Sequence, residues 1–454
     1  MQRKVDLGLV NGQLVVTEED LKEIAKNAKT DVLSEVKSTL DAINGYEGYA
    51  DVIGLQVDYE NNRGIRLAGA KGLEAGVDFD KFPMYGGMKR CNVSDNGTIT
   101  AYYGDATYKE DGSNGQVMVY IPKFYYRVFP LKLEKIKDSP SYHIRKANYF
   151  VSNKQYPNFK VHPAFINEQG KEVDYFLYSA YEGSFMAYYW NGTNGIFDEE
   201  SNDINLSVNE EKSAIWSVAD VKPISGGYIN LTRQKAEKFA NNLYANGKGW
   251  HIETIKALSA LQFLMMIEFG TMNMQNAFST GLVLAQNSAL TGSTKELGNK
   301  SGEAISTGNG KVACSYRGIE NPYGNLYRLV QGINVYNYDK WNCGRMKIAD
   351  NFDFNDNSLG YTLTNLSVPY GYDYISSMGY YDVEYDWLFI PSEKNGTSAS
   401  IVGDEFRTSS SNNIPDTGVI ISGAGNGLFF ASYGFVLTDF DDNIGCRLIY
   451  LPQN

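Results

Sequence analysis

The side chains best suited to binding chemistry in this sequence are aromatic and acidic, and they are concentrated from residue 361 onward. Two short segments carry most of them, Tyr370-Gly-Tyr-Asp-Tyr374 and Tyr380-Tyr-Asp-Val-Glu-Tyr-Asp-Trp387. Aromatic rings stack on the faces of sugars, and carboxylates accept hydrogen bonds from sugar hydroxyl groups. The same composition suits a protein receptor, because aromatic anchors dominate binding hot spots. A purely structural role as core aromatics is the alternative interpretation.

We therefore predict a ligand-binding surface in the loops of this region and in a later segment around residues 426–440. Loops held on a rigid scaffold commonly carry recognition. The predicted contact residues are Tyr361, Tyr370, Tyr372, Tyr374, Tyr380, Tyr381, Trp387, Asn426, Phe429 and Tyr433.

Catalytic motifs are missing from the sequence. Its three histidines, His143, His162 and His251, fit no zinc-binding spacing, and no nucleophile-elbow motif occurs. His162 precedes Pro163 among aromatic residues, which favours a structural histidine. The four cysteines, at positions 91, 314, 343 and 446, have no metal-binding spacing, so buried free thiols are expected. We predict a protein that is not an enzyme and needs no cofactor.

Two acidic loops carry oxygen ligands of the kind that calcium prefers. In the loop of residues 350–357 the candidate ligands are Asp350, Asp353 and Asp356, and carboxylates also cluster in residues 439–443. Neither loop has the twelve-residue register of an EF-hand. Solvated turns capped by Asp and Asn side chains are the favoured interpretation, with calcium as the alternative.

The overall charge argues against several kinds of partner. Lys and Arg number 41 against 53 Asp and Glu, which gives 41 − 53 = −12. Such a balance disfavours nucleic acid and anionic membranes as ligands. The chain has no apolar run long enough for a transmembrane helix, and no apolar segment of a signal peptide follows its first residues.

The N-terminal segment predicts a long helix. Thr17-Glu-Glu-Asp20 has the pattern of a capped helix start, and apolar residues recur at three- and four-residue steps from Leu21 to Ile43. A helix with one apolar stripe needs a partner, so we predict a coiled coil, most simply a homotrimer, that ends before Gly45. A helix packed on its own domain is the alternative.

The remainder predicts strands and two further helices. Residues 98–103 and 117–121 read as strands, the second of them central in its sheet. Thr232 and Thr254 cap helices over 232–243 and 254–269, and the second helix is apolar nearly all round and stops at Gly270. Beyond residue 290 the composition predicts loops with only short strands. The predicted domains are a helical attachment segment (1–45), a small β-rich region (46–115) and a C-terminal domain (116–454).

One segment carries a family resemblance. Gly324-Asn325 is a tight turn, and Leu326, Tyr327, Leu329 and Val330 form a buried strand that Gly332 is expected to end. The segment resembles the core motif of C-type lectin-like domains of the formylglycine-generating-enzyme type, in the version found in phage and prophage tail proteins of Gram-positive hosts. Tyr327 and Leu329 stand where that motif has tryptophans.

Further segments resemble the same family in the same order. They are Ile65–Ala70, Phe82-Pro-Met-Tyr85, Val117–Tyr126, His162-Pro-Ala-Phe165, Tyr178–Ser184 and Ile444-Gly-Cys-Arg-Leu448. The resemblance implies an α+β fold whose C-terminal lectin-like domain packs two helices on a twisted antiparallel sheet. The family's enzymes carry a reactive cysteine pair near the C-terminal end, where this chain has only Cys446, so the resemblance does not imply their activity.

The expected function is that of a phage-tail receptor-binding protein, which recognises a glycan or protein on the bacterial surface without catalysis. Its expected partners are that receptor and other tail proteins, and its expected location is the virion tail, reached without a signal peptide. The alternatives are a tail-associated glycan depolymerase, a structural tail or baseplate component, and a protein whose loops from Gly423 to Ile444 are diversified by a retroelement.

Overall fold

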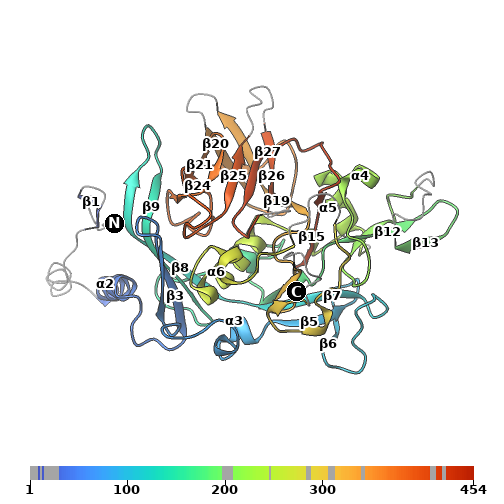
Figure 1. The fold of residues 1–454 in the computed structure, drawn as a ribbon, viewed down its shortest axis with the longest axis horizontal. Coiled ribbons are helices and arrows are strands. Elements are labelled where there is room, and N and C mark those ends of the chain that lie inside the picture. Colours follow the sequence, from blue (N-terminus) through green and yellow to red (C-terminus); the bar gives the residue numbers. More distant parts are fainter. Residues whose placement is uncertain are drawn as a thin grey trace.

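The protein is known here from a computed structural model, which describes residues 9–10, 13–14, 30–196, 208–244, 247–282, 288–304, 312–338, 343–408, 416–421 and 426–453. The fold is mostly β, with 37% strand and 14% helix, and its strands form several antiparallel sheets (Figure 1). The predicted α+β class, with its coiled coil and its lectin-like domain of two helices on one twisted sheet, is therefore wrong.

The described part of the N-terminal helix packs on the body of its own chain. Helix α2 spans Thr30–Ile43, and residues 17–29 of the prediction lie outside the described residues. Ala42 is fully buried, its carbonyl accepts a hydrogen bond from Asn148 at 2.8 Å, and Arg127 donates to the Ser38 carbonyl at 2.9 Å. These contacts of Ser38 and Ala42 hold α2 against the body, while Val36, Leu40 and Ile43 of the predicted apolar stripe are half-buried.

The first large sheet contains the longest hairpin of the molecule's described part. Strands β8 and β9 pair along most of their length, and the hairpin rises beside the C-terminal strands (Figure 1). On its other side, β9 pairs with β3 and, near its start, with β23. The sheet comprises β1 (Leu9–Val10), β2 (Gln13–Leu14), β3 (Val52–Asp58), β4 (Arg63–Ala68), β8 (Tyr125–Lys135), β9 (Tyr142–Ser152), β10 (Lys160–Val161), β23 (Ser377–Tyr380) and β24 (Pro391–Glu393).

The second sheet has six strands in the order β15-β29-β11-β7-β5-β6. The predicted strand over 117–121 is confirmed as β7, between β11 and β5, and the predicted strand over 98–103 is confirmed as the edge strand β6. The strands are β5 (Lys89–Val93), β6 (Ile99–Tyr102), β7 (Gln116–Pro122), β11 (Tyr175–Ser179), β15 (Trp250–Ile252) and β29 (Leu448–Tyr450).

The third sheet is built from residues that the composition had predicted to be loops. Its strand β19 begins after the Gly324-Asn325 turn, where both residues have positive φ, but it does not stop at Gly332. Gly332 has φ +81° within a register shift between Leu329 and Asn334, so it bends the strand rather than ending it. The strands are β19 (Tyr327–Tyr338), β20 (Cys343–Ala349), β21 (Tyr361–Pro369), β22 (Tyr372–Tyr374), β25 (Glu405–Thr408), β26 (Asp416–Ile421), β27 (Ala431–Phe435) and β28 (Ile444–Gly445).

The two predicted internal helices are confirmed. Helix α5 spans Arg233–Asn241 and helix α6 spans Ile255–Phe269, with Thr232 and Thr254 accepting capping hydrogen bonds and Gly270 ending α6 at φ +73°. Helix α6 is buried on nearly every side and contacts β3, β9 and β19, so it lies between sheets. No helix in the described part of the chain is long and apolar enough to cross a membrane.

The smaller elements complete the body. They are the helices α3 (Pro83–Gly86), α4 (Gly226–Ile229) and α7 (Met274–Ala277), the 3-10 turns η1 (Val77–Phe79), η2 (Pro163–Phe165) and η3 (Lys295–Leu297), and the strands β12 (Ser184–Tyr188), β13 (Asn194–Ile196), β14 (Ala214–Trp216), β16 (Gly302–Glu303), β17 (Cys314–Tyr316) and β18 (Ile319–Glu320). The predicted domain boundaries at 45/46 and 115/116 stay predictions; strands from both sides of residue 115 pair within one sheet.

Candidate binding surface

The most exposed of the predicted contact residues lie at one edge of the third sheet. Tyr370 is 38% exposed and Tyr372 is 56% exposed. Strand β22 ends the strand order of this sheet and pairs only with β25 among the described strands, with Tyr372 opposite Arg407 and Tyr374 opposite Glu405. We call these five residues, Tyr370, Tyr372, Tyr374, Glu405 and Arg407, the tyrosine edge.

The Tyr372 ring is held by two charged neighbours. The Arg407 guanidinium lies 4.6 Å from the ring centroid, and the Tyr372 hydroxyl donates to the Glu405 carboxylate. Partial burial and Glu405 together raise the pKa of Tyr372, so the hydroxyl keeps its proton. The same guanidinium also lies 5.9 Å from the centroid of the Phe430 ring, so Arg407 lies between two aromatic rings. Tyr372 is thus an exposed ring with a fixed orientation.

Backbone contacts make the edge rigid. Gly371 donates to the Thr408 hydroxyl at 2.6 Å and accepts from the Thr408 amide at 2.8 Å. Lys394 donates to the Tyr370 carbonyl at 3.1 Å, and Gly396 donates to the Tyr374 carbonyl at 3.1 Å. The tyrosines therefore sit on a braced strand and not on a free loop.

Two other predicted residues lie on a different sheet. Tyr380 is opposite Tyr142 where β23 pairs with β9, and both Tyr380 and Tyr381 are half-buried. Nearby, burial raises the pKa of the Asp386 carboxyl to about 6, against the opposing effect of Lys160 at 2.8 Å. The Tyr126 hydroxyl also donates to Asp386 at 2.8 Å. The Asp386 carboxylate in this part of the aromatic segment is thus paired with Lys160 and Tyr126.

The remaining predicted contacts point inward. Trp387, Asn426, Phe429 and Tyr433 are between 3% and 8% exposed, and Tyr361 is half-buried, with its hydroxyl accepting from the Asn355 amide at 3.2 Å. The structure therefore brings together Tyr370, Tyr372 and Tyr374 and places the others elsewhere.

The candidate calcium ligands have protein partners. Asp356 accepts from Arg233 at 2.7 Å and from Gln234 at 3.1 Å, and Asp350 accepts from the Thr362 hydroxyl at 2.6 Å. Among the residues that the structure describes, no group of three or more His, Cys, Asp or Glu side chains could hold a metal ion. The Phe352 and Phe354 rings of the same loop lie against His251 at 5.0 and 5.4 Å.

The reactive side chains of the described part are mostly buried. His162 is a structural histidine, as predicted: its Nδ1 accepts from the Ala164 amide and its Nε2 lies 3.2 Å from Ser259 Oγ. Cys91, Cys314 and Cys446 are buried free thiols, also as predicted, while the side chain of Cys343 lies outside the described part. Burial raises the pKa of Cys91 and Cys314 to about 12, which disfavours the thiolate.

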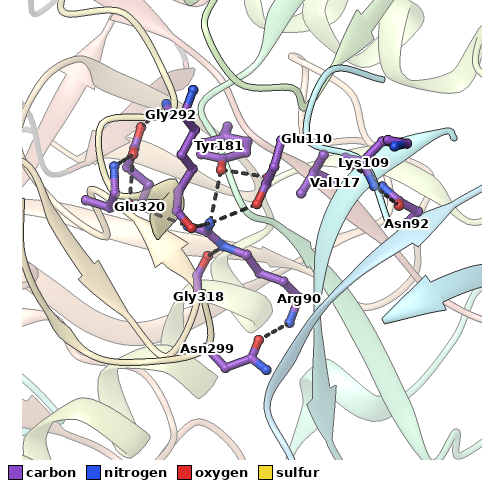
Figure 2. Close-up of polar contacts among 12 residues, drawn as sticks. Arg90, Asn92, Lys109, Glu110, Val117, Tyr181, Gly292, Asn299, Gly318 and Glu320 are labelled. Carbon is purple, nitrogen blue, oxygen red and sulfur yellow. Dashed lines mark hydrogen bonds and ion pairs between the residues drawn. The ribbon is translucent and has the colours of Figure 1, made fainter. Parts of the chain in front are cut away.

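A dense polar cluster around Arg90 is structural. Figure 2 shows the guanidinium of Arg90, which donates to the Gly318 carbonyl at 2.8 Å, to the Tyr181 hydroxyl at 3.0 Å and to Glu110 at 3.3 Å. It also donates to the Lys295 carbonyl at 3.3 Å and to the Thr294 hydroxyl at 3.4 Å. Arg90 has no exposed surface, and its amide donates to Asn299 at 2.7 Å. The cluster ties together segments that are distant in the chain.

An open groove of about 210 Å³ lies between the turn of the β8–β9 hairpin and strands β20, β21 and β24. Sequence reasoning missed it, because its walls come from four separate segments. They are residues 136–140, Arg345, the outward-facing polar positions of β21, and Ser392; the lining comprises Ile136, Lys137, Asp138, Ser139, Pro140, Arg345, Asn365, Ser367, Pro369 and Ser392. The only sequence signal was the alternation Asn365-Leu-Ser367-Val of a half-buried strand.

Ser392, which lines this groove, contacts His143. Ser392 Oγ lies 3.0 Å from His143 Nδ1 and 3.2 Å from the Ser377 carbonyl, to which it donates. A hydroxyl whose proton is engaged with a carbonyl accepts from the imidazole and is not activated by it. Burial lowers the pKa of His143, so the imidazole is neutral near pH 7. His143 thus holds the Ser392 side chain in place at the wall of the groove, and the pair does not form an activated nucleophile.

No protein-family model matches the chain, and no curated protein matches it.

Proposed function

We propose that the protein is a non-catalytic receptor-binding component of a phage tail or phage-derived particle, and that it holds a bacterial surface glycan or protein at the tyrosine edge. Two independent features support this proposal. The first is the ordered series of segments that resemble phage tail proteins of Gram-positive hosts. The second is the exposed and braced aromatic surface around Tyr372.

The observation that carries the proposal is the environment of Tyr372. Its ring is more than half exposed, yet Arg407 on one face and Glu405 at the hydroxyl fix its orientation. Binding loses least free energy to ordering when the anchor is already immobile in the free protein. An exposed ring beside a cation and a carboxylate can stack on an apolar sugar face while its neighbours bind hydroxyl groups.

The net charge of the protein and its proposed partners are compatible with a component of a phage particle. The net charge of −12 suits recognition through aromatic contacts more than through electrostatic attraction to acidic polymers in general. Attachment to other tail proteins and assembly as a homotrimer belong to the same proposal. The coiled coil that suggested the trimer is not part of the proposal, because α2 packs on its own body.

Binding is favoured over glycan cleavage by the state of the carboxylates near the aromatic segment. A glycosidase needs two carboxyl groups that flank the substrate in an open site. Asp386 has a raised pKa, as an acid catalyst would, but Lys160 and Tyr126 both donate to its Oδ1 atom. The depolymerase alternative would therefore require that pair to open.

The proposal is tested by cell binding of the labelled full-length protein, measured on a panel of Gram-positive bacteria. Tyr372→Ala removes the anchor, and an aromatic anchor contributes on the order of 2 kcal/mol, so we expect binding to weaken roughly thirtyfold. Tyr102→Ala is the matched control, because Tyr102 is 39% exposed on β6 of another sheet. Melting temperatures of both variants should stay close to that of the parent.

Two results would count against the proposal. If the parent protein binds no cell surface, a purely structural tail component is the better interpretation. If the parent binds and Tyr372→Ala, Tyr370→Ala and Arg407→Ala bind equally well, the receptor contact lies elsewhere on the protein.

A further inference from the structure

The groove beside the β8–β9 hairpin has the chemistry of a ligand site. Hydroxyl and amide groups come from Ser139, Ser367, Ser392 and Asn365, and the charged side chains are Lys137, Asp138 and Arg345. Two positive groups against one negative group give +2 − 1 = +1, in a protein whose net charge is −12. The groove is therefore a locally cationic, hydroxyl-lined site on an acidic molecule.

Arg345 is positioned before any ligand arrives. Its Nε and one terminal nitrogen donate to the Thr364 carbonyl at 3.2 and 3.0 Å, and the same nitrogen donates to Asn365 Oδ1 at 2.8 Å. These bonds fix the plane of the guanidinium. Its other terminal nitrogen, Nη1, makes no hydrogen bond to any residue that the structure describes, and no described carboxylate lies within ion-pair distance of Arg345. Arg145, by contrast, pairs with Glu134 and Glu393.

The size and position of the groove limit what it can hold. The groove has a volume of about 210 Å³, whereas sites for drug-sized ligands begin at roughly 300 Å³. It therefore suits a ligand the size of a single small polar unit of a polymer. Pro369 lines the groove, and the next residue in the chain, Tyr370, belongs to the tyrosine edge. One polymer could reach both places.

We propose that this groove binds one anionic, hydroxyl-bearing unit of a surface polymer, with Arg345 pairing its carboxylate or phosphate oxygens. The planar guanidinium fork matches two oxygen atoms of either group, which a lysine ammonium cannot do. The Ser367 hydroxyl and the Asn365 amide nitrogen then bind the ligand's hydroxyl groups, while the Ser139 and Ser392 hydroxyls are engaged with Ser141 and Ser377. The identity of the polymer rests on the proposed function; the anion site itself does not.

The test is direct titration of the full-length protein, followed by calorimetry or by ligand-observed NMR. Three small probes are used: glucuronic acid for the carboxylate, glycerol 3-phosphate for the phosphate, and glucose as the neutral counterpart. We expect one or both anions to bind at least tenfold more tightly than glucose, and the stronger of the two identifies the class of polymer.

Variants assign the effect to the groove. Arg345→Ala should weaken binding of the preferred anion at least tenfold, and Arg345→Lys should retain only part of the parent's affinity. Ser367→Phe should block binding while leaving Arg345 in place. Arg63→Ala, at an exposed arginine on β4, is the control and should bind like the parent. Melting curves of all variants show whether each is folded.

The proposal is overturned if neither anion is preferred to glucose, or if a folded Arg345→Ala and a folded Ser367→Phe both bind like the parent. This outcome is distinct from failure of the proposed function. The probes report on the groove even when no cell surface is bound, and cells bound independently of Arg345 would leave the tyrosine edge as the receptor site.

Discussion

Arg328 Nε donates to Glu253 Oε2 over 2.8 Å, and neither side chain has any exposed surface. Glu253 immediately precedes the cap of α6, while Arg328 belongs to β19. The other oxygen of Glu253 accepts from the Tyr178 hydroxyl at 2.5 Å, which brings in β11 of the second sheet. One carboxylate thus joins two sheets to the start of the central helix.

Glu253→Gln is expected to lower the free energy of unfolding by about 3–5 kcal/mol, because it leaves the Arg328 charge buried without its partner. Urea unfolding of the full chain measures the change. Asp220→Asn is the control, since the Asp220–Lys295 pair is exposed and should contribute about 0–1 kcal/mol. Equal and small effects of the two substitutions would contradict this view of the buried pair.

His251 predicts a loss of stability at alkaline pH. Burial opposes its charge, but Glu237 at 2.6 Å and Glu168 at 2.9 Å outweigh burial and raise the pKa of His251 to about 9. The unfolded value is about 6.5. The stabilisation is therefore fully present below pH 6.5 and is lost as the pH rises towards 9. The difference corresponds to about 3 kcal/mol.

Urea unfolding at several pH values between 6 and 9.5 measures that loss. In His251→Gln the decline across this range should be largely absent, and the variant should be less stable than the parent at pH 6. A parent protein whose stability is constant from pH 6 to 9.5 would show that the histidine is not held as a cation.

A comparison of Gly97 with Gly72 distinguishes a glycine required for lack of space from one required only by its backbone conformation. Both have positive φ, at +83° and +77°. A Cβ on Gly97 would lie 1.9 Å from the Tyr450 ring, whereas a Cβ on Gly72 meets nothing within 4 Å. We expect Gly72→Ala to cost about 1 kcal/mol through strain alone and Gly97→Ala to cost about 1–3 kcal/mol more.

Adding Tyr450→Leu to Gly97→Ala should recover part of the loss, because the smaller side chain leaves room for the new methyl group. Thermal melting of the three variants measures this recovery. Equal costs for the two glycine substitutions would mean that Tyr450 moves aside freely.

Calcium is not expected to stabilise the loop of residues 350–357. The Asp356 carboxylate already accepts from the buried Arg233, so a calcium ion would have to displace that cation. Melting temperatures in millimolar calcium and in a chelator should agree within about 1 °C, while Asp356→Asn should cost about 2 kcal/mol. A calcium-dependent rise of several degrees that Asp356→Asn abolishes would establish the loop as a calcium site.

Elements with local signals were predictable from the sequence. The Thr caps and the apolar periodicity fixed α5 and α6, and the continuous apolar run at 117–121 identified a central strand. Apart from the start of β19, the third sheet was not predictable, because its strands are rich in Tyr, Ser, Asn and Thr. They are paired by residues far apart in the chain, such as Phe406 with Ala431. Composition alone cannot separate such strands from loops.

The candidate site was predictable only in part. Gly371 and Asp373 beside Tyr372 are typical of an exposed turn; Tyr372 is exposed, but it lies in strand β22 and not in a turn. Trp387 precedes an apolar run, and it is buried. The groove at Arg345 could not be found from the sequence, since Ile136, Arg345 and Ser392 become neighbours only when three segments fold together.

The place of β29 has a consequence for how the chain reaches this structure. Residues 448–450 lie between β15 and β11, so the second sheet has two separate parts until these residues have been synthesised. Until then the facing edges of β11 and β15 are unpaired, and unpaired edges promote aggregation. A nascent chain that has not yet reached β29 should therefore depend on chaperones, and a chain cut before residue 448 should yield an insoluble product, not a smaller folded one.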